Sequence, residues 1–476
     1  MFCFSDDPEC VPQDNLVLRS TIEPIPLNSI YIKLGDTGSE FTKRFMVSLA
    51  MIANRQLALF QNLHTQLERD KETFYARFRE ATGLDWKESS DAQKEHHIEN
   101  HSALVSKIGA VEAIIRTLRE MDVPPDMSRY RPTSRTRTAF AAAFEERRTG
   151  LMRVISEIEK LIGMHSIKNN IAAIIVQYVY DPASAGQNHL NIALGGPPGT
   201  GKSTIALMLM KVYYNLGVLP KPVPPDALAK RNGGDLVSAF EGGTAGKTNQ
   251  FMTDILGSVG FLDEAYSLAA RHDGRASYGK IAIDTIVSAL DVYMGITCLI
   301  VAGYARELEE SFFKANIGMP RRFPMRWETE EFTGEQLYCI LVTMLADRNV
   351  AFTPEGCSSA MSLIQRAHEL GIFRRSNAGG IKTVVDLCIR TDTVMQYHQG
   401  GGTDPLTGAV ERHIQPSVFR NALALYIQSM LHKDAVFYET DPAKAASKRS
   451  QEGIDPSEGD VMMEDPAPRR LRRKRQ

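Results

Sequence analysis

A glycine-rich segment at residues 196–203 contains the residue types that bind phosphate. It reads Gly-Pro-Pro-Gly-Thr-Gly-Lys-Ser and matches the phosphate-loop pattern G-x-x-x-x-G-K-[S/T] at every fixed position. Glycines let backbone N–H groups turn toward phosphate oxygens, and the N-terminus of a following helix adds positive potential. The pattern predicts a site for a nucleoside triphosphate, formed by Gly196, Pro197, Pro198, Gly199, Thr200, Gly201, Lys202, Ser203 and Thr204.

The segments on both sides of this loop have the pattern that a phosphate loop requires. Residues 190–194 form a short, mostly apolar run typical of a buried strand, and residues 204–214 favour a helix because they contain no glycine or proline. This context favours a phosphate loop over a chance glycine-rich turn. We expect Lys202 to contact the β- and γ-phosphates and Ser203 to bind Mg²⁺ through its hydroxyl.

A pair of carboxylates follows about sixty residues after the loop, where the apolar run 259–262 ends in Asp263 and Glu264. Acidic side chains buried at the end of a strand need a cation or a proton partner. We expect Asp263 to hold Mg²⁺, through water, and Glu264 to polarise the water that attacks the γ-phosphorus. Without the phosphate loop, a strand ending at a solvated acidic turn would fit equally well.

Another apolar run at residues 298–302 predicts a further buried strand. Apolar strands that alternate with helical segments indicate an α/β fold, in which helices cover both faces of a parallel sheet.

These motifs together resemble one family, the red-type Rubisco activase (CbbX/CfxQ) branch of the AAA+ ATPases with its sporulation-protein relatives. The likeness covers about residues 151–430. It is carried by the phosphate loop and by residues 159–163, 234–237, 243–248, 261–266, 278–279, 301–304 and 316–323. The resemblance implies an AAA+ P-loop NTPase core with a parallel sheet, followed by a small α-helical lid domain and preceded here by an α-helical N-terminal region.

The resemblance also implies a homo-oligomeric ring, usually a hexamer, with ATP between subunits. Arg322 has the position of the arginine finger, and Arg321 is the alternative; outside this family both would be ordinary surface charges. Phe240 aligns with the aromatic residue of a central pore loop that grips a threaded polypeptide, although it also fits a buried loop anchor. Residues 271–278 have the position of a second pore loop. Lys202, Glu264 and Arg322 are therefore the predicted catalytic residues, and Ser203 and Asp263 the predicted metal ligands.

Two positions depart from expected patterns. The small-domain motif of this family is Asn-Ala-Arg, whereas this chain has glycine at its third position, in Asn377-Ala378-Gly379. The arginine that would sense the γ-phosphate is therefore missing, with Lys382, Arg374 and Arg375 as nearby substitutes. Gly303-Tyr304 lacks the Asn or Thr of the usual AAA+ sensor, as in the rest of the family.

The remaining chain has a different pattern. Apolar residues recur at helical spacing between residues 41 and 118 with a break at Gly83, which predicts a helical hairpin or bundle. Such a stripe forms either a core or a docking face, and family members carry partner-selecting modules in such regions. We expect six parts: an irregular segment 1–37, the hairpin 38–122, a linker 123–150, the ATPase domain 151–332, the lid 333–438 and a disordered tail 439–476.

Composition predicts a soluble, intracellular, multidomain protein. The net charge of −2 is not the strongly basic charge that is typical of nucleic-acid-binding proteins. The sequence has no run of 18 apolar residues, the length needed to span a membrane. Six cysteines without CxxC spacing indicate reduced thiols. His96, His97 and His101 fit a solvated helix face better than a metal site. The acidic residues near the N-terminus argue against a transit peptide.

The basic cluster 469–475 near the C-terminus predicts a nuclear signal or a nucleic-acid contact, with a merely solvated tail as the alternative. We expect a location in the nucleus or cytoplasm of a eukaryotic cell, with a viral origin also open. The function predicted overall is a Mg²⁺-dependent AAA+ ATPase that remodels or threads a protein partner. The alternatives are a nucleic-acid-linked motor or loader and a nucleotide-gated scaffold with weak turnover. Rubisco as the partner is a minority interpretation.

Overall fold

The structure is a computed structural model of the 476-residue chain. It describes residues 24–94, 97–124, 127, 139–184, 187–221, 228–238, 243–269, 276–398 and 412–440. The chain divides into two compact units. The first contains residues up to 340 together with 364–381, and the second contains 341–363 and the residues from 382 onward.

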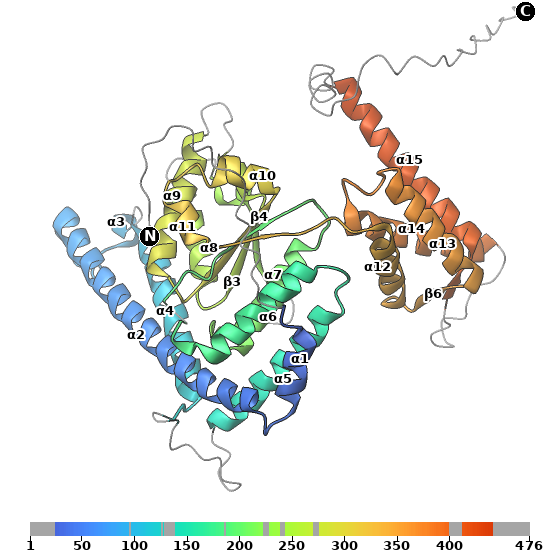
Figure 1. The fold of residues 1–476 in the computed structure, drawn as a ribbon. Coiled ribbons are helices and arrows are strands. Elements are labelled where there is room, and N and C mark those ends of the chain that lie inside the picture. Colours follow the sequence, from blue (N-terminus) through green and yellow to red (C-terminus); the bar gives the residue numbers. More distant parts are fainter. Residues whose placement is uncertain are drawn as a thin grey trace, which may run out of the picture. The chain divides into compact units, whose positions relative to one another are not determined.

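A five-stranded parallel sheet forms the centre of the first unit (Figure 1). Its strands lie in the order β2-β3-β4-β1-β5, so β1 is flanked by β4 and β5. Every residue of β1 and β4 is buried, as expected for a parallel sheet that is covered on both faces. The strands are β1 (Ile192–Gly195), β2 (Ala229–Asn232), β3 (Val259–Asp263), β4 (Cys298–Gly303) and β5 (Met325–Glu328).

Helices flank this sheet, which confirms the α/β prediction. In Figure 1, α6 and α7 lie on one side of the strands, and α8 and α9 lie on the other. Helix α7 directly follows the loop after β1. The helices are α5 (Ala139–Glu159), α6 (His165–Tyr180), α7 (Lys202–Asn215), α8 (Gly243–Asp254), α9 (Ala276–Val292), α10 (Ala305–Glu307) and α11 (Met319–Arg322). Short turns of 3₁₀-helix form η1 (Pro182–Ser184), η2 (Gly233–Leu236) and η3 (Ala265–Ala269), and η4 (Leu308–Phe312) is a π-helical turn.

The N-terminal region is helical, as the apolar spacing predicted. Helix α2 runs unbroken over Glu40–Thr82, begins at Ser39, whose side chain accepts a hydrogen bond from the Thr42 N–H, and ends at Gly83 with φ 71°. Helix α4 (Ile98–Glu120) packs along it, and α3 (Asp91–Lys94) lies in the connection between them.

Two segments differ from the sequence-based description. Helix α1 (Leu27–Gly35) lies inside the segment expected to be irregular, and α5 begins at residue 139 inside the expected linker. In α1 only Leu27, Ile30 and Leu34 are buried. Such a short stripe is a weak helix signal by itself, and packing of α1 against α5 decides the structure here.

Helix α5 also supports the helix that follows the phosphate loop. Arg147, which is 4% exposed, donates to the carbonyl of Tyr214 in the last turn of α7. Its guanidinium lies 4.3 Å from the centre of the Tyr214 ring. A cation at a helix C-terminus interacts favourably with the helix dipole. The end of α7 is therefore fixed by a residue of α5.

The second unit is helical, in agreement with the expected small helical domain. It contains α15 (Pro416–Thr440) and the main parts of α13 (Pro354–Glu369) and α14 (Asn377–His398). Helix α12 (Gly334–Ala346) starts in the first unit. Strands β6 (Val350–Phe352) and β7 (Arg412–Ile414) pair in parallel within the second unit.

Candidate functional site

The predicted phosphate loop connects the end of β1 to the start of α7, at the carboxyl edge of the parallel sheet. Gly196 has φ 140°, and a Cβ there would lie 2.1 Å from the Thr329 hydroxyl oxygen. Gly199 has φ 73°, and a Cβ there would lie 1.9 Å from the Ser376 carbonyl oxygen. Gly199 is not a fixed position of the motif, yet this chain requires glycine there as well.

The Lys202 side chain folds onto the phosphate loop that precedes it in the sequence. Its ammonium group donates to the carbonyls of Gly196 at 2.8 Å and Pro197 at 2.6 Å. Burial lowers the pKa of Lys202, and the negative charge of Asp263 opposes that shift. The ammonium therefore lies within the loop where phosphate oxygens are expected.

Thr200 supports the loop with its side chain. Its hydroxyl donates to the Pro197 carbonyl at 2.8 Å and contacts the Thr329 hydroxyl at 2.6 Å. Thr329 follows β5, and its N–H donates to the Gly195 carbonyl at 2.9 Å. Both threonines are buried. Thr200 can therefore meet a phosphate only through its backbone, and Thr329 is a loop-supporting residue that no sequence motif indicated.

The two predicted metal ligands, Ser203 and Asp263, both contact the ammonium group of Lys230. Ser203, in the first turn of α7, accepts a hydrogen bond from the Lys230 ammonium at 3.3 Å. The same ammonium lies 2.9 Å from a carboxylate oxygen of Asp263, at the end of β3. A hydroxyl and a carboxylate are oxygen ligands of the kind that Mg²⁺ takes, with phosphates and water completing its shell. The Ser203–Asp263 pair therefore fits a bound Mg²⁺.

Glu264 is exposed and has φ 49°, an uncommon backbone conformation for a residue other than glycine. Its carbonyl accepts from the Ser267 N–H at 2.9 Å, which starts the turn after β3. The sequence predicted a buried pair of acids, but only Asp263 is partly buried. The backbone turn at Glu264 places the two carboxylates in different environments. The Asp263 carboxylate is partly buried, whereas the exposed Glu264 carboxylate can contact water.

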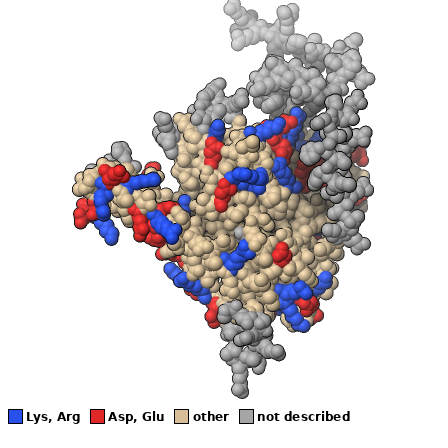
Figure 2. All heavy atoms as spheres, turned by 60° about the vertical axis from the view of Figure 1, so that its left-hand side comes forward, with Lys and Arg blue, Asp and Glu red and all other residues tan. Residues whose placement is uncertain are grey.

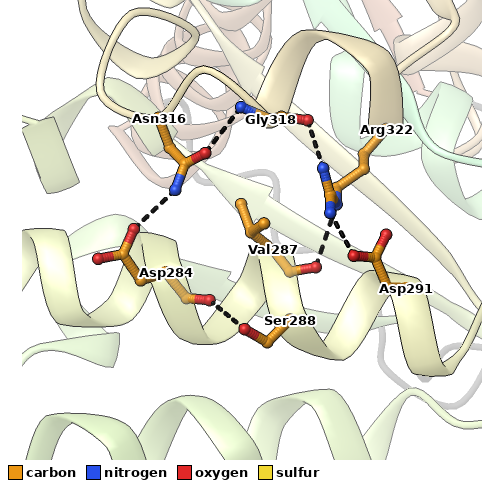
Figure 3. A network of polar contacts seen from close by, with 7 residues as sticks. All are labelled: Asp284, Val287, Ser288, Asp291, Asn316, Gly318 and Arg322. Carbon is orange, nitrogen blue, oxygen red and sulfur yellow. Dashed lines mark hydrogen bonds and ion pairs between the residues drawn. The ribbon is translucent and has the colours of Figure 1, made fainter.

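Arg322 is held by contacts within the chain (Figure 3). Its guanidinium donates to the Val287 carbonyl at 3.1 Å and the Gly318 carbonyl at 2.6 Å, and it forms an ion pair with Asp291. The Arg322 side chain is 4% exposed, whereas Arg321 is exposed. The structure thus distinguishes two arginines that the sequence could not separate.

A second connection in this region joins α11 to α9. Asn316 donates to Asp284 at 2.7 Å and accepts from the Gly318 N–H at 2.8 Å. Figure 3 shows Asp284 and Asp291 on the same helix, facing the loop before α11 and Arg322 respectively. The segment that carries both arginines is therefore fixed to α9 at two points.

Residues at the start of α14 contact the phosphate loop within the first unit. The side chain of Asn377 donates to the Pro198 carbonyl at 3.2 Å and accepts from the Phe332 N–H at 3.3 Å. The Ala378 N–H donates to the Gly199 carbonyl at 3.2 Å. A Cβ at Gly379 would lie 3.8 Å from the Gly199 Cα. The motif that departs from the family pattern thus lies directly against the loop.

Comparisons with known proteins identify relatives of the part of the chain that forms the sheet. Residues 192–324 match the model of the ATPase family associated with various cellular activities (AAA). Stage V sporulation protein K of Bacillus subtilis is 34% identical over 42% of this chain and 64% of its own length. The chloroplastic ribulose bisphosphate carboxylase/oxygenase activase of Cyanidioschyzon merolae is 29% identical over 51% of this chain and 82% of its own. Protein CbbX of Cereibacter sphaeroides is 31% identical over 50% of this chain and 77% of its own.

The chain belongs to the CbbX/CfxQ-like family of AAA+ ATPases. Because the match covers about half of this chain and less than two thirds of the sporulation protein, it concerns the ATPase core. Members of the AAA+ class bind ATP, which identifies ATP as the nucleotide for the phosphate loop. The family resemblance stated from the motifs is confirmed.

Several predicted features of this family member lie outside the described residues. These are Phe240, residues 271–275 of the expected second pore loop, His96, and the tail from residue 441 onward. Their predicted roles stay predictions.

His97 and His101 are half-buried and pack against aromatic side chains. The His101 ring stacks on Trp86 with centroids 4.4 Å apart, and the Tyr75 hydroxyl lies 3.1 Å from its Nε2. The His97 ring meets Phe78 edge to face at 5.3 Å. Among the described residues, no group of three or more His, Cys, Asp or Glu side chains could hold a metal ion. Both side chains are partly exposed, so the expectation of a solvated helix face holds only in part: the two rings also contact an aromatic cluster formed by α2, α4 and the segment between them.

Two further predictions concern the chain as a whole. In the parts that the structure describes, Cys298, Cys357 and Cys388 are free thiols, in agreement with the prediction for those three. None of the helices in these parts has the length and apolar character that crossing a bilayer demands.

Proposed function

We propose that this chain is a Mg²⁺-dependent ATPase whose subunits form a ring, a hexamer, and that hydrolysis at the subunit interfaces remodels or threads a protein partner. The observation that carries the ATPase part is the approach of Ser203 and Asp263 to one shared cation beside the phosphate loop. Their helix and strand belong to an AAA+ core, which supports a metal–nucleotide site at that position.

The roles of the residues follow from their positions. Lys202 is proposed to exchange the carbonyls of Gly196 and Pro197 for the β- and γ-phosphates of ATP. Ser203 and Asp263 are proposed to hold Mg²⁺, which when bound neutralises charge on the phosphate oxygens. Glu264 is proposed to accept a proton from the attacking water, a role that its exposure and separate environment support.

An arginine from the neighbouring subunit is proposed to complete each site. The sequence favoured Arg322, with Arg321 as the alternative. Arg322 would have to leave two carbonyls and Asp291 before it could reach another subunit. Arg321 is exposed and needs no such rearrangement, so the geometry favours Arg321 as the finger, with Arg322 holding α11 in place.

A protein partner is supported by the family. One relative is named as the activase of ribulose bisphosphate carboxylase/oxygenase, an enzyme. We propose that Phe240 contacts the threaded polypeptide and that the region α1–α4, which lies outside the matched family segment 192–324, selects the partner. Nothing in the ATPase core specifies the partner's identity.

Nucleic acid is the second candidate partner, because of the basic residues 469–475. On the face shown in Figure 2, positive and negative side chains are interspersed without an extended patch of one sign. We propose that nucleic-acid binding depends on the tail, and we also propose the tail as a nuclear import signal. A steep loss of DNA binding with added salt that disappears on deletion of residues 466–476 would support this alternative.

The test is ATP hydrolysis by the wild type, Lys202→Ala and Glu264→Gln, with assembly size followed in parallel. Lys202→Ala should lose nucleotide binding. Glu264→Gln should keep it and lose turnover by at least about 100-fold, because general-base catalysis contributes factors of that size. Stimulation of the wild type by unfolded protein supports remodelling, whereas stimulation by DNA supports the nucleic-acid motor. ATP-dependent assembly without turnover in the wild type would indicate a nucleotide-gated scaffold.

A further inference from the structure

Lys230 contacts both residues that are proposed to bind Mg²⁺. It lies on the edge strand β2, where it pairs in register with Phe261 of β3, while Asn232 pairs with Asp263. The lysine side chain extends along the strand, so that its ammonium lies 5.3 Å from the centre of the Phe261 ring. From there it reaches Asp263 at 2.9 Å and Ser203 at 3.3 Å.

The chemistry of this contact resembles that of a metal ion. An ammonium is a compact positive charge with three donors, and it lies between a carboxylate and a hydroxyl oxygen. Lys202, the lysine of the phosphate motif, directs its ammonium to the carbonyls of Gly196 and Pro197 instead. Lys230 is thus the cation that pairs with Asp263, and no phosphate-loop motif includes it.

We propose that the Lys230 ammonium competes with Mg²⁺ for Ser203 and Asp263 and thereby lowers the affinity of the nucleotide site for the metal. This inference rests on the proposed function of these two residues. A positive charge within hydrogen-bonding distance of both ligands repels a divalent cation that takes the same oxygens. Because 46% of the Lys230 side chain is exposed, the ammonium can move into solvent when the metal binds.

Mn²⁺ is a suitable probe, because its free ion is measured directly by electron paramagnetic resonance. The experiment measures the Kd of Mn²⁺ for the full chain saturated with ADP, and separately the Kd of ADP in EDTA. Lys230→Met removes the charge and keeps the length of the side chain. Lys230→Arg keeps the charge, and Asp263→Asn removes the carboxylate ligand. Arg231→Met is the matched control, since Arg231 lies on the same strand and pairs with Asp254 at 3.8 Å.

We expect Lys230→Met to tighten Mn²⁺ binding about five- to tenfold, within the range of a partly exposed charge interaction. ADP binding in EDTA should not change. Lys230→Arg and Arg231→Met should bind Mn²⁺ like the wild type. Unchanged Mn²⁺ affinity in Lys230→Met would overturn the inference and leave a surface ion pair without influence on the metal. Weaker Mn²⁺ or ADP binding would also overturn it, because Lys230 would then contact the bound nucleotide.

The Asp263→Asn variant separates an error in the proposed metal–nucleotide site from an error in the role of Lys230. If the wild type does not bind ADP, or if Asp263→Asn binds Mn²⁺ as the wild type does, the proposed metal–nucleotide site is wrong and the inference falls with it. If Asp263→Asn weakens Mn²⁺ binding but Lys230→Met has no effect, only the role of Lys230 is wrong.

Discussion

Asn377 donates its side-chain amide to the carbonyl of Pro198, a residue 179 positions earlier in the phosphate loop. Asn377 is 2% exposed and has φ 45°, a conformation that asparagine tolerates better than most residues. The nucleotide loop of the first unit is therefore fastened by a residue at the start of α14. One buried and one partly buried hydrogen bond depend on this side chain, and asparagine also suits the unusual backbone conformation.

We expect Asn377→Ala to lower the free energy of unfolding by about 2–3 kcal/mol, because the Phe332 N–H loses its acceptor and alanine is strained at positive φ. The affinity for ADP should fall as well, since the loop loses an anchor. Asn377→Gly is the matched control, because it relieves the backbone strain but still lacks the amide. Denaturant unfolding and ADP titration of both variants measure the two contributions, and wild-type values in both variants would contradict the anchoring role.

The neighbouring arginines of α11 should have separable effects. Arg322→Ala removes three contacts of a buried guanidinium, and we expect it to cost about 2–3 kcal/mol in denaturant unfolding. Arg321→Ala should change stability by less than about 0.5 kcal/mol, as exposed substitutions usually do.

Mixing of subunits tests which arginine acts on a neighbour. Arg321→Ala subunits keep an intact nucleotide site, and Glu264→Gln subunits keep an intact finger. Each variant alone should be inactive, and a mixture should regain part of the ATPase activity at interfaces where the two complement each other. If Arg321→Ala alone is fully active, and Arg322→Ala is inactive with normal stability, the sequence-based assignment of Arg322 as the finger is supported instead.

Restoring the family arginine at position 379 should strengthen ATP binding. A side chain there would start in ordinary contact with Gly199, at 3.8 Å, so the substitution fits the space. A guanidinium hydrogen bond to phosphate is worth about 1.5–3 kcal/mol, so we expect Gly379→Arg to tighten ATP binding about tenfold or more. Gly379→Ala controls for the gain in helix propensity. Equal ATP affinities in the two variants would show that this position does not reach the γ-phosphate.

The aromatic cluster around His101 should make the N-terminal region sensitive to acid. Burial lowers the pKa of His101, and the positive charges of Lys71 and Lys94 lower it further. The unfolded chain therefore binds this proton more tightly than the folded chain. The contribution of His101 to stability is intact above its ordinary pKa of about 6.5 and is lost as the pH falls below that value.

Trp86 fluorescence reports on this cluster in a Trp327→Phe background, since the chain has two tryptophans. We expect the denaturation midpoint followed by Trp86 to drop between pH 8 and pH 5. The drop should be smaller in His101→Phe, which keeps a ring but cannot take up a proton. An equal drop in both proteins would mean that other groups cause it.

The sequence by itself determined the features that depend only on residues close together along the chain. The phosphate loop, the strand that ends in Asp263 and the long α2 helix each have a local pattern, because backbone conformation and hydrophobic periodicity are set within one element. The short helix α1 escaped detection, because three buried positions give too weak a stripe.

Only the tertiary structure decided which residues surround these motifs. Thr329, Lys230 and Asn377 reach the loop or its proposed metal ligands from segments at least 27 positions away. The burial of Arg322 and the exposure of Arg321 likewise depend on α9, which approaches from another part of the chain. Such contacts follow from strand order and helix packing, which join distant segments without leaving a local pattern in the sequence.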